Sequence, residues 1–129
     1  MLQKKIAETR AFTIDQLDNG IIRVEKKREV ELFPSDLDDN YSIYKEFLGG
    51  EKGLFLIIFQ IDCLSDEDFR NKAADPHRSQ IKKAEALVIK SLANRIESNF
   101  YVNFHKPPYP IEIFTNEQEA IKWLLSFGD

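Results

Sequence analysis

Residues 54–61, Leu54-Phe55-Leu56-Ile57-Ile58-Phe59-Gln60-Ile61, form the most apolar stretch of the sequence, interrupted only by Gln60. A run that is apolar at nearly every position is typical of a strand buried on both faces, in a sheet covered by helices. It is far shorter than the roughly 20 residues of a membrane-spanning helix. We therefore expect this segment to be the central strand of an α/β sheet.

Upstream, two segments alternate apolar and polar residues on either side of Asp18-Asn19-Gly20. Alternation is typical of half-buried strands, and Asn-Gly between two such segments is a hairpin signal. We predict antiparallel strands at residues 11–17 and 21–27. Alternation resumes at Val30 and Leu32, so the second strand either ends at residues 26–28 or continues, bends or bulges before Pro34.

Apolar periodicity and start signals predict four helices. The first covers residues 35–48, with Ser35 as its cap. A short second helix follows Ser65 and carries Phe69, and a final helix follows the capping-box pattern of residues 115–118. The apolar positions assigned to the buried face of the first helix are Leu37, Tyr41, Tyr44 and Leu48.

The third predicted helix covers residues 91–104. Its apolar positions recur at near-helical spacing and are expected to form an aromatic-rich buried face; they are Leu92, Ile96, Phe100 and Phe104. Tyr101 and Val102 lie off this stripe, so they must contact another element, a ligand or a second subunit.

Strands are also predicted at residues 84–89 and 111–114, which completes the order β-β-α-β-α-β-α-β-α. Strands separated by helices should run parallel through right-handed crossovers. The expected fold is a single α/β domain over residues 1–129, with its core at about 11–127. Its mixed, mostly parallel sheet would have about five strands, an N-terminal antiparallel hairpin and about four helices.

Composition narrows the function. Eighteen Lys and Arg against 22 Asp and Glu give a net charge of −4, with the two signs interspersed. We therefore expect neither nucleic acid binding nor membrane insertion. The first residues lack the apolar stretch of a signal peptide and Cys63 is the only cysteine, so a cytoplasmic location is expected.

The element order, with the central strand ending in an Asp-x-x-Ser pattern at Asp62 and Ser65, resembles the STAS domain of sulfate transporters and anti-sigma factor antagonists. Residues 106–110, Lys-Pro-Pro-Tyr-Pro, and residues 113–124, Ile-Phe-Thr-Asn-Glu-Gln-Glu-Ala-Ile-Lys-Trp-Leu, are similar to small stand-alone STAS-like (SpoIIAA-like) proteins of bacteria. The resemblance implies a non-enzymatic module that binds a protein partner in bacterial regulation.

The same resemblance implies a partner surface around Asp62, Ser65, Asp66 and Phe69, with Ser65 as the candidate phosphoacceptor. Antagonists that are phosphorylated typically carry Asp-Ser-Ser/Thr-Gly at this point, whereas residues 62–66 read Asp-Cys-Leu-Ser-Asp. The acidic residues after Ser65 disfavour a phosphate there, and helix capping explains the serine without one. A phosphorylation switch is therefore not favoured.

An alternative function belongs to another class: a small-molecule or lipid-binding module resembling CRAL-TRIO lipid-transfer domains. The aromatic residues of the third helix and the final helix would line an apolar pocket under residues 91–104. The candidate lining residues are Phe100, Tyr101, Phe104 and Trp123. Binding of a small apolar ligand and formation of a homo-oligomer both remain open at this point.

Catalytic and metal-binding patterns are missing from the sequence. It contains no Gly-rich phosphate loop, no Gly-x-Ser-x-Gly elbow and no His-Glu-x-x-His helix. His77 and His105 are too far apart to suggest zinc ligands at the usual spacing. We expect no enzymatic activity, no cofactor and no metal site.

Overall fold

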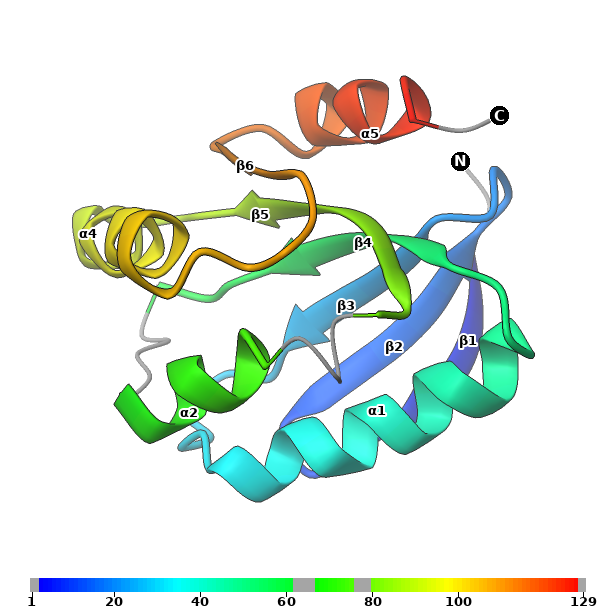
Figure 1. The fold of residues 1–129 in the computed structure, drawn as a ribbon, viewed down its shortest axis with the longest axis horizontal. Coiled ribbons are helices and arrows are strands. Elements are labelled where there is room, and N and C mark those ends of the chain that lie inside the picture. The colour runs from blue at the N-terminus through cyan, green and yellow to red at the C-terminus, as the bar shows by residue number, and fades with distance from the viewer. Residues whose placement is uncertain (1–2, 62–66, 76–79, 128–129) are drawn as a thin grey trace.

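One six-stranded sheet organises the protein in the computed structural model, which describes residues 3–61, 67–75 and 80–127 (Figure 1). The strands are neighbours in sequence order throughout the sheet. They are β1 (Gln3–Glu8), β2 (Phe12–Leu17), β3 (Ile22–Lys26), β4 (Gly53–Ile58), β5 (Lys82–Val88) and β6 (Ile111–Phe114).

Strand pairing divides the sheet into two parts. β1 with β2, and β2 with β3, pair antiparallel, whereas β3 with β4, β4 with β5, and β5 with β6 pair parallel. The apolar run at residues 54–61 supplies β4, which lies between two parallel neighbours. The predicted central strand and the predicted mixed α/β sheet are therefore confirmed.

The sheet has one strand more than the sequence predicted. β1 lies at the sheet edge, and its residues are exposed except for the half-buried Ile6 and Ala7. Alternation is typical of strands with one buried side, and β1 lacks it because most of its residues are exposed on both sides. β3 ends at Lys26, and Glu29 has a positive φ of 56°, so the strand does not continue toward Leu32.

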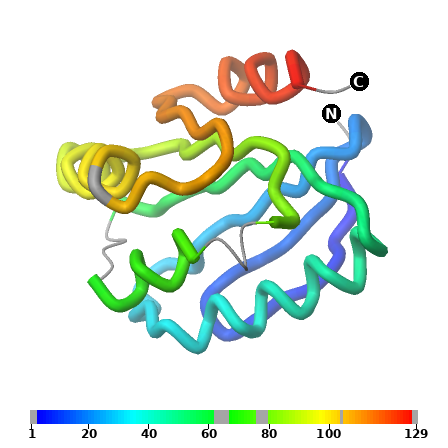
Figure 2. The backbone as a smooth tube through the Cα atoms, viewed as in Figure 1, coloured from blue at the N-terminus to red at the C-terminus, as the bar shows by residue number. Residues whose placement is uncertain are grey.

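The described helices are α1 (Pro34–Leu48), α2 (Glu67–Ala73), α4 (Leu92–Phe100), the π-helix η1 (Tyr101–His105) and α5 (Glu117–Leu125). Three parallel crossovers step in the same direction across the sheet. Right-handed crossovers in one direction place their helices on one face. α1 and α2 accordingly cover one face, α4 lies beside α2 toward β6, and α5 covers the opposite face (Figures 1 and 2).

Each face of the sheet carries its own core. The cluster on the α1 side includes Phe12, Ile14, Val24, Tyr44, Phe55 and Phe69. The cluster on the α5 side includes Leu56, Ile58, Ala86, Val88, Ile121 and Leu124. Alternate residues of β4 thus enter opposite cores, as burial on both faces requires. None of the helices in the described ranges combines the length and the apolar character needed to cross a membrane.

Two helix starts differ from the predictions by a residue or two. Ser35 is not the cap of α1, because the helix begins at Pro34 and Phe33 is the N-cap. The Asp36 carboxylate takes the capping role by accepting a hydrogen bond from the Phe33 backbone N–H at 2.8 Å. At α5, Asn116 caps the helix by accepting from the Glu119 N–H at 3.0 Å. The predicted Ser65 cap of α2 lies outside the described residues.

The predicted buried face of the third helix is wrong. Leu92 is 73% exposed, Ile96 63% and Phe100 42%. The buried side of α4 instead carries Asn94 and Ser98. The helix also becomes a π-helix at Tyr101, which rotates the following side chains relative to continued α-helical spacing.

Candidate functional site

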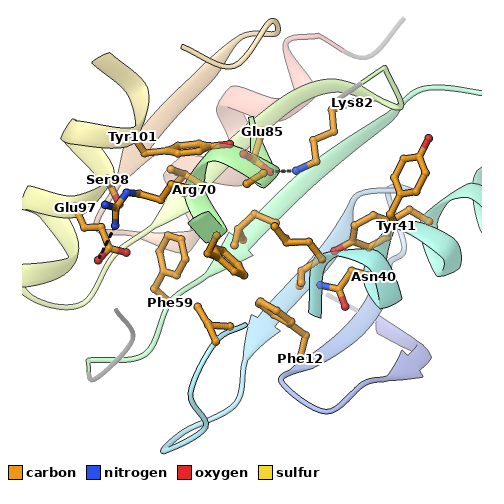
Figure 3. Close-up of a pocket in the computed structure, with 18 of the residues that line it drawn as sticks. Phe12, Asn40, Tyr41, Phe59, Arg70, Lys82, Glu85, Glu97, Ser98 and Tyr101 are labelled. Atoms are coloured by element: carbon orange, nitrogen blue, oxygen red, sulfur yellow. Dashed lines mark hydrogen bonds and ion pairs between the residues drawn. The ribbon is translucent and has the colours of Figure 1, made fainter. Parts of the chain in front are cut away.

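A cavity of about 120 Å³ lies between the sheet and the helices on its α1 face (Figure 3). Its floor consists of residues of the sheet whose side chains share that face, together with Phe59, which follows the end of β4: Phe12, Val24, Ile57, Phe59, Glu85 and Leu87. Helices α1, α2 and α4 form the walls, together with Tyr101 of η1. The cavity therefore draws on segments between Phe12 and Tyr101.

Small side chains help to leave this space open. α2 presents Ala73 to the cavity, and α4 presents Ser98. A leucine at either position would extend by several methyl and methylene groups into the gap. Protein interiors normally contain few voids larger than a water molecule, so a hollow of this size in the α1-side core is a candidate binding site.

Most of the cavity surface is apolar, but β5 places a carboxylate in it. Glu85 is only 3% exposed. It forms an ion pair with Lys82 and accepts a hydrogen bond from the Tyr109 hydroxyl at 3.0 Å. A hydrogen bond also joins the side chains of Tyr101 and Tyr109. Glu85, Lys82, Tyr101 and Tyr109 are called the Glu85 cluster below.

The tyrosines near Glu85 are held in their neutral form. Burial raises the pKa of Tyr44, Tyr101 and Tyr109 above the ordinary value for a phenol, and the negative charge of Glu85 raises each pKa further. A neutral phenol retains its proton and can donate it. Tyr109 is therefore a stable donor to Glu85 across the physiological pH range.

Lys82 is also fixed by aromatic neighbours. Its ammonium nitrogen lies 5.2 Å from the ring centre of Phe55 and 5.5 Å from that of Tyr109. Both distances fall within the range of cation–π attraction. The rings and the Glu85 carboxylate together hold this cation at one end of the cavity.

A second pair of opposite charges lies at the other end of the cavity. Arg70 Nη1 of α2 is 3.7 Å from Glu97 Oε2 of α4, and the Arg70 guanidinium lies 5.4 Å from the centre of the Phe100 ring. Figure 3 shows this pair at the opposite end from Lys82. The charged side chains that line the cavity thus balance, two cations against two anions.

The structure brings together only part of the predicted pocket. Tyr101 is buried and lines the cavity. Phe100 contacts the Arg70 guanidinium at the partly exposed end. Trp123 lies on the other face of the sheet, where its ring packs against Phe114 and Phe127. The side chain of Phe104 lies outside the described residues.

The predicted partner surface can be traced at one residue only. Asp62, Ser65 and Asp66 lie outside the described residues, so that prediction stays a prediction. Phe69 is 9% exposed and forms part of both the α1-side core and the cavity wall. Its buried position suits a ligand wall better than a contact with a protein partner.

Glu85 and Lys82 are the site residues that the sequence did not single out. The sequence does contain a pattern that indicates Glu85 as a site residue. Glu85 is a charged residue within the otherwise apolar strand Ala84-Glu85-Ala86-Leu87-Val88. A charge at such a position requires a buried partner or a functional role. Within the described ranges, no group of three or more His, Cys, Asp or Glu residues could hold a metal ion.

The chain is an α/β domain with a mostly apolar cavity on one face of a mixed sheet. Residues 16–128 match the family described as Domain of unknown function (DUF7793), and the chain belongs to that family. A search of curated proteins finds no match.

Among solved structures, the chain is similar to a protein with unknown function from Arthrobacter sp. FB24, a crystal structure at 2.20 Å resolution. The two sequences are 22% identical, and the match covers 92% of this chain and 95% of the other, with a TM-score of 0.33.

Proposed function

We propose that this domain binds a small, mainly apolar molecule in the cavity between its sheet and helices α1, α2 and α4. The observation that carries the proposal is the cavity of about 120 Å³ beside a buried polar cluster. Ligand sites are typically apolar hollows with a few polar groups that orient the ligand. A cavity of about 150 Å³ lined by apolar side chains can hold benzene. At about 120 Å³ this cavity is somewhat smaller, so it suits a single small ring or a short apolar portion of a larger ligand.

Partial exposure of Arg70 and Glu97 supports access to the site. Both residues line the cavity, and their side chains are 17% and 22% exposed. The cavity is therefore not sealed from solvent between α2 and α4. A small molecule can enter there without separating the strands of the sheet.

Benzene is a suitable probe for this proposal. We expect saturable binding in a titration followed by backbone amide chemical shifts, with the largest changes at residues that line the cavity. Ala73→Leu should fill the cavity and weaken binding by about tenfold or more, since about 1.4 kcal/mol corresponds to a factor of ten. Ala74→Leu is the matched control, because Ala74 follows Ala73 but does not line the cavity.

Two outcomes would contradict the proposal. One is the absence of saturable benzene binding by the folded wild-type domain. The other is equal binding by Ala73→Leu and Ala74→Leu, which would place any binding elsewhere. Native mass spectrometry of the protein from its own host would complement this titration, because it would report a retained ligand by mass.

A second candidate function is protein interaction, which the STAS-like resemblance implies. The observation in its favour is the exposed stripe Leu92, Ile96 and Phe100 on α4. Such stripes commonly mark interaction sites. Two copies of α4 packed antiparallel about a twofold axis would pair Leu92 with Phe100 and Ile96 with itself, so the stripe is self-complementary.

Sedimentation equilibrium tests this second candidate directly. If two copies pair through α4, the wild-type domain should dimerise and Ile96→Glu should be monomeric at the same concentration. A monomeric wild type would remove self-association through α4. Kinship with STAS-like domains, a role without catalysis and a cytoplasmic location remain part of this proposal and rest on the sequence alone.

A further inference from the structure

We propose that the ligand of this cavity is a neutral molecule with an apolar body and a hydroxyl group that donates a hydrogen bond to Glu85. This inference rests on the proposed function and specifies the class of ligand. Phenols and small alcohols are the simplest members of that class. Two features of the cavity support this class of ligand: the unused hydrogen-bonding capacity of Glu85 and the balance of charges in the lining.

Glu85 retains capacity to accept hydrogen bonds. An ionised carboxylate offers about four lone-pair positions. Within the described part of the chain, Lys82 donates to one oxygen and Tyr109 to the other. Glu85 also lines the cavity and is almost fully buried, so water has little access to its remaining positions. A donor on a bound molecule can occupy such a position and recover hydrogen bonding that burial removes.

The charge of the cavity favours a neutral ligand. Lys82 is paired with Glu85 at one end, and Arg70 is paired with Glu97 at the other. An anionic ligand that paired with Lys82 or Arg70 would leave the carboxylate of that pair uncompensated, and a cationic ligand that paired with Glu85 or Glu97 would leave a cation uncompensated. Burying an unbalanced charge is costly, whereas a neutral ligand leaves both pairs intact.

The same residues favour a donor over a pure acceptor. The Tyr109 hydroxyl already donates to Glu85, and the Lys82 ammonium is engaged by that carboxylate and by two aromatic rings. The Tyr101 hydroxyl is hydrogen-bonded to Tyr109, so an ether or a ketone finds no uncommitted donor in the Glu85 cluster. A hydroxyl supplies the proton that the carboxylate can accept.

Three probes of related shape test this inference: benzene, phenol and anisole. Phenol can donate a hydrogen bond, anisole can only accept one, and benzene can do neither. A hydrogen bond to a charged group contributes about 1.5–3 kcal/mol, so phenol should bind the wild-type domain about tenfold or more tightly than benzene. Anisole should show no such gain.

A carboxylate-to-amide substitution identifies the acceptor. Glu85→Gln should reduce the preference for phenol over benzene by at least about threefold while benzene still binds. Glu112→Gln is the matched control, because Glu112 is exposed on β6. If Glu85→Gln fails to fold, the wild-type comparison of phenol with anisole still tests the preference for a hydroxyl donor, and equal affinity for the two probes would overturn the inference.

The outcomes separate this inference from the function on which it rests. Binding of none of the three probes contradicts the proposed function. Binding of all three with similar affinity leaves the cavity as a binding site and overturns the hydroxyl assignment. Tighter binding of phenol that is unchanged in Glu85→Gln also overturns it, because another group would then be the acceptor.

Discussion

Asp36 shows how a single buried charge ties several elements of this domain together. The residue is 1% exposed. It accepts two hydrogen bonds from the Arg10 guanidinium, at 3.0 and 2.6 Å, and one from the Phe33 N–H. Burial opposes its ionisation, but the Arg10 and Phe33 hydrogen bonds and the charges of Arg10 and Lys26 together lower its pKa below the ordinary value.

Replacement of this carboxylate should therefore destabilise the fold in a pH-dependent manner. We expect Asp36→Asn to lower the free energy of unfolding by about 1–3 kcal/mol at neutral pH, measured by urea denaturation. Because the folded pKa is lowered, the contribution of Asp36 is present above the unfolded pKa of about 3.9 and is lost as pH falls through the folded pKa. The difference between wild type and variant should shrink in that acidic range.

Asp39→Asn is the control for this experiment, since Asp39 is exposed on the same helix. It should change the free energy of unfolding by less than about 0.5 kcal/mol. An Asp36→Asn variant as stable as the wild type would contradict the assigned role of the Arg10–Asp36 pair.

The buried tyrosines give an expectation at the alkaline end of the pH scale. The pKa is raised for Tyr44, Tyr101 and Tyr109, whereas unfolded tyrosine ionises near about pH 10. Their contribution to stability is thus fully present below that value and is lost as pH rises toward the folded pKa. Tyrosinate absorbance from these residues should appear only together with unfolding, as followed by circular dichroism.

A fully native domain in which all four tyrosines ionise near their ordinary pKa would contradict this burial.

The variant Tyr109→Phe tests the contribution of the Tyr109 hydroxyl to stability. It removes the donor to Glu85 and should lower the free energy of unfolding by about 1–3 kcal/mol, with a smaller loss for Tyr41→Phe, because Tyr41 is only partly buried.

At the scale of elements, α4 shows that hydrophobic periodicity can predict a helix correctly without predicting which face of the helix is buried. The spacing of Leu92, Ile96 and Phe100 correctly indicates a helix, because those positions share one face. Packing nevertheless turns the opposite face inward. Asn94 accepts a hydrogen bond from the Lys90 N–H at 3.1 Å, and the small Ser98 lines the cavity. A polar residue with a local partner can thus occupy a buried position that periodicity assigns to an apolar one.

Hydrophobicity alone would predict that Ile96 contributes more to stability than Asn94. Because Ile96 is exposed and Asn94 is buried, we expect the reverse. Ile96→Lys should change the free energy of unfolding by less than about 0.5 kcal/mol, as at other exposed positions. Asn94→Ala should lower it by about 1–3 kcal/mol because the Lys90 N–H loses its acceptor. Chemical denaturation of both variants at low protein concentration provides the measurement. A larger loss for Ile96→Lys than for Asn94→Ala would contradict the observed orientation.

Over the whole molecule, the sequence predicts the parts that depend on local pattern. The apolar run at residues 54–61, the Asn-Gly turn and the helix start signals predict the order of elements and the parallel sheet. The edge strand β1 was not predicted because most of its residues are exposed, which leaves no alternating pattern. The sequence predicted a pocket under residues 91–104 with Tyr101 in its lining, but not the rest of that lining. The cavity depends on Ala73 and Ser98 facing the same space from different helices, a relation that exists only after the chain has folded.

The arrangement of strands also predicts how protection from hydrogen exchange is distributed. β4 has paired neighbours on both sides and cores on both faces, whereas β1 lies at an edge and is mostly exposed. Amides of β4 should exchange only through global opening, and those of β1 through local fraying. Hydrogen exchange with peptide-level mass spectrometry tests this order. Similar rates in β1 and β4 would contradict the central position of β4.

Because the crossovers step in one direction across the sheet, the sheet and the helices that wall the cavity are distinct parts of the molecule. Backbone hydrogen bonds between strands hold the sheet together. The walls of the cavity come largely from helices α1, α2 and α4, which are joined to the sheet at their ends. Substitutions that change side-chain size on α2 or α4 can therefore change the shape of the cavity without disturbing the hydrogen bonds between strands. If the proposed ligand role holds, sequence variation within the family should concentrate at cavity-lining positions such as Ala73 and Ser98, while the residues of β4 vary little.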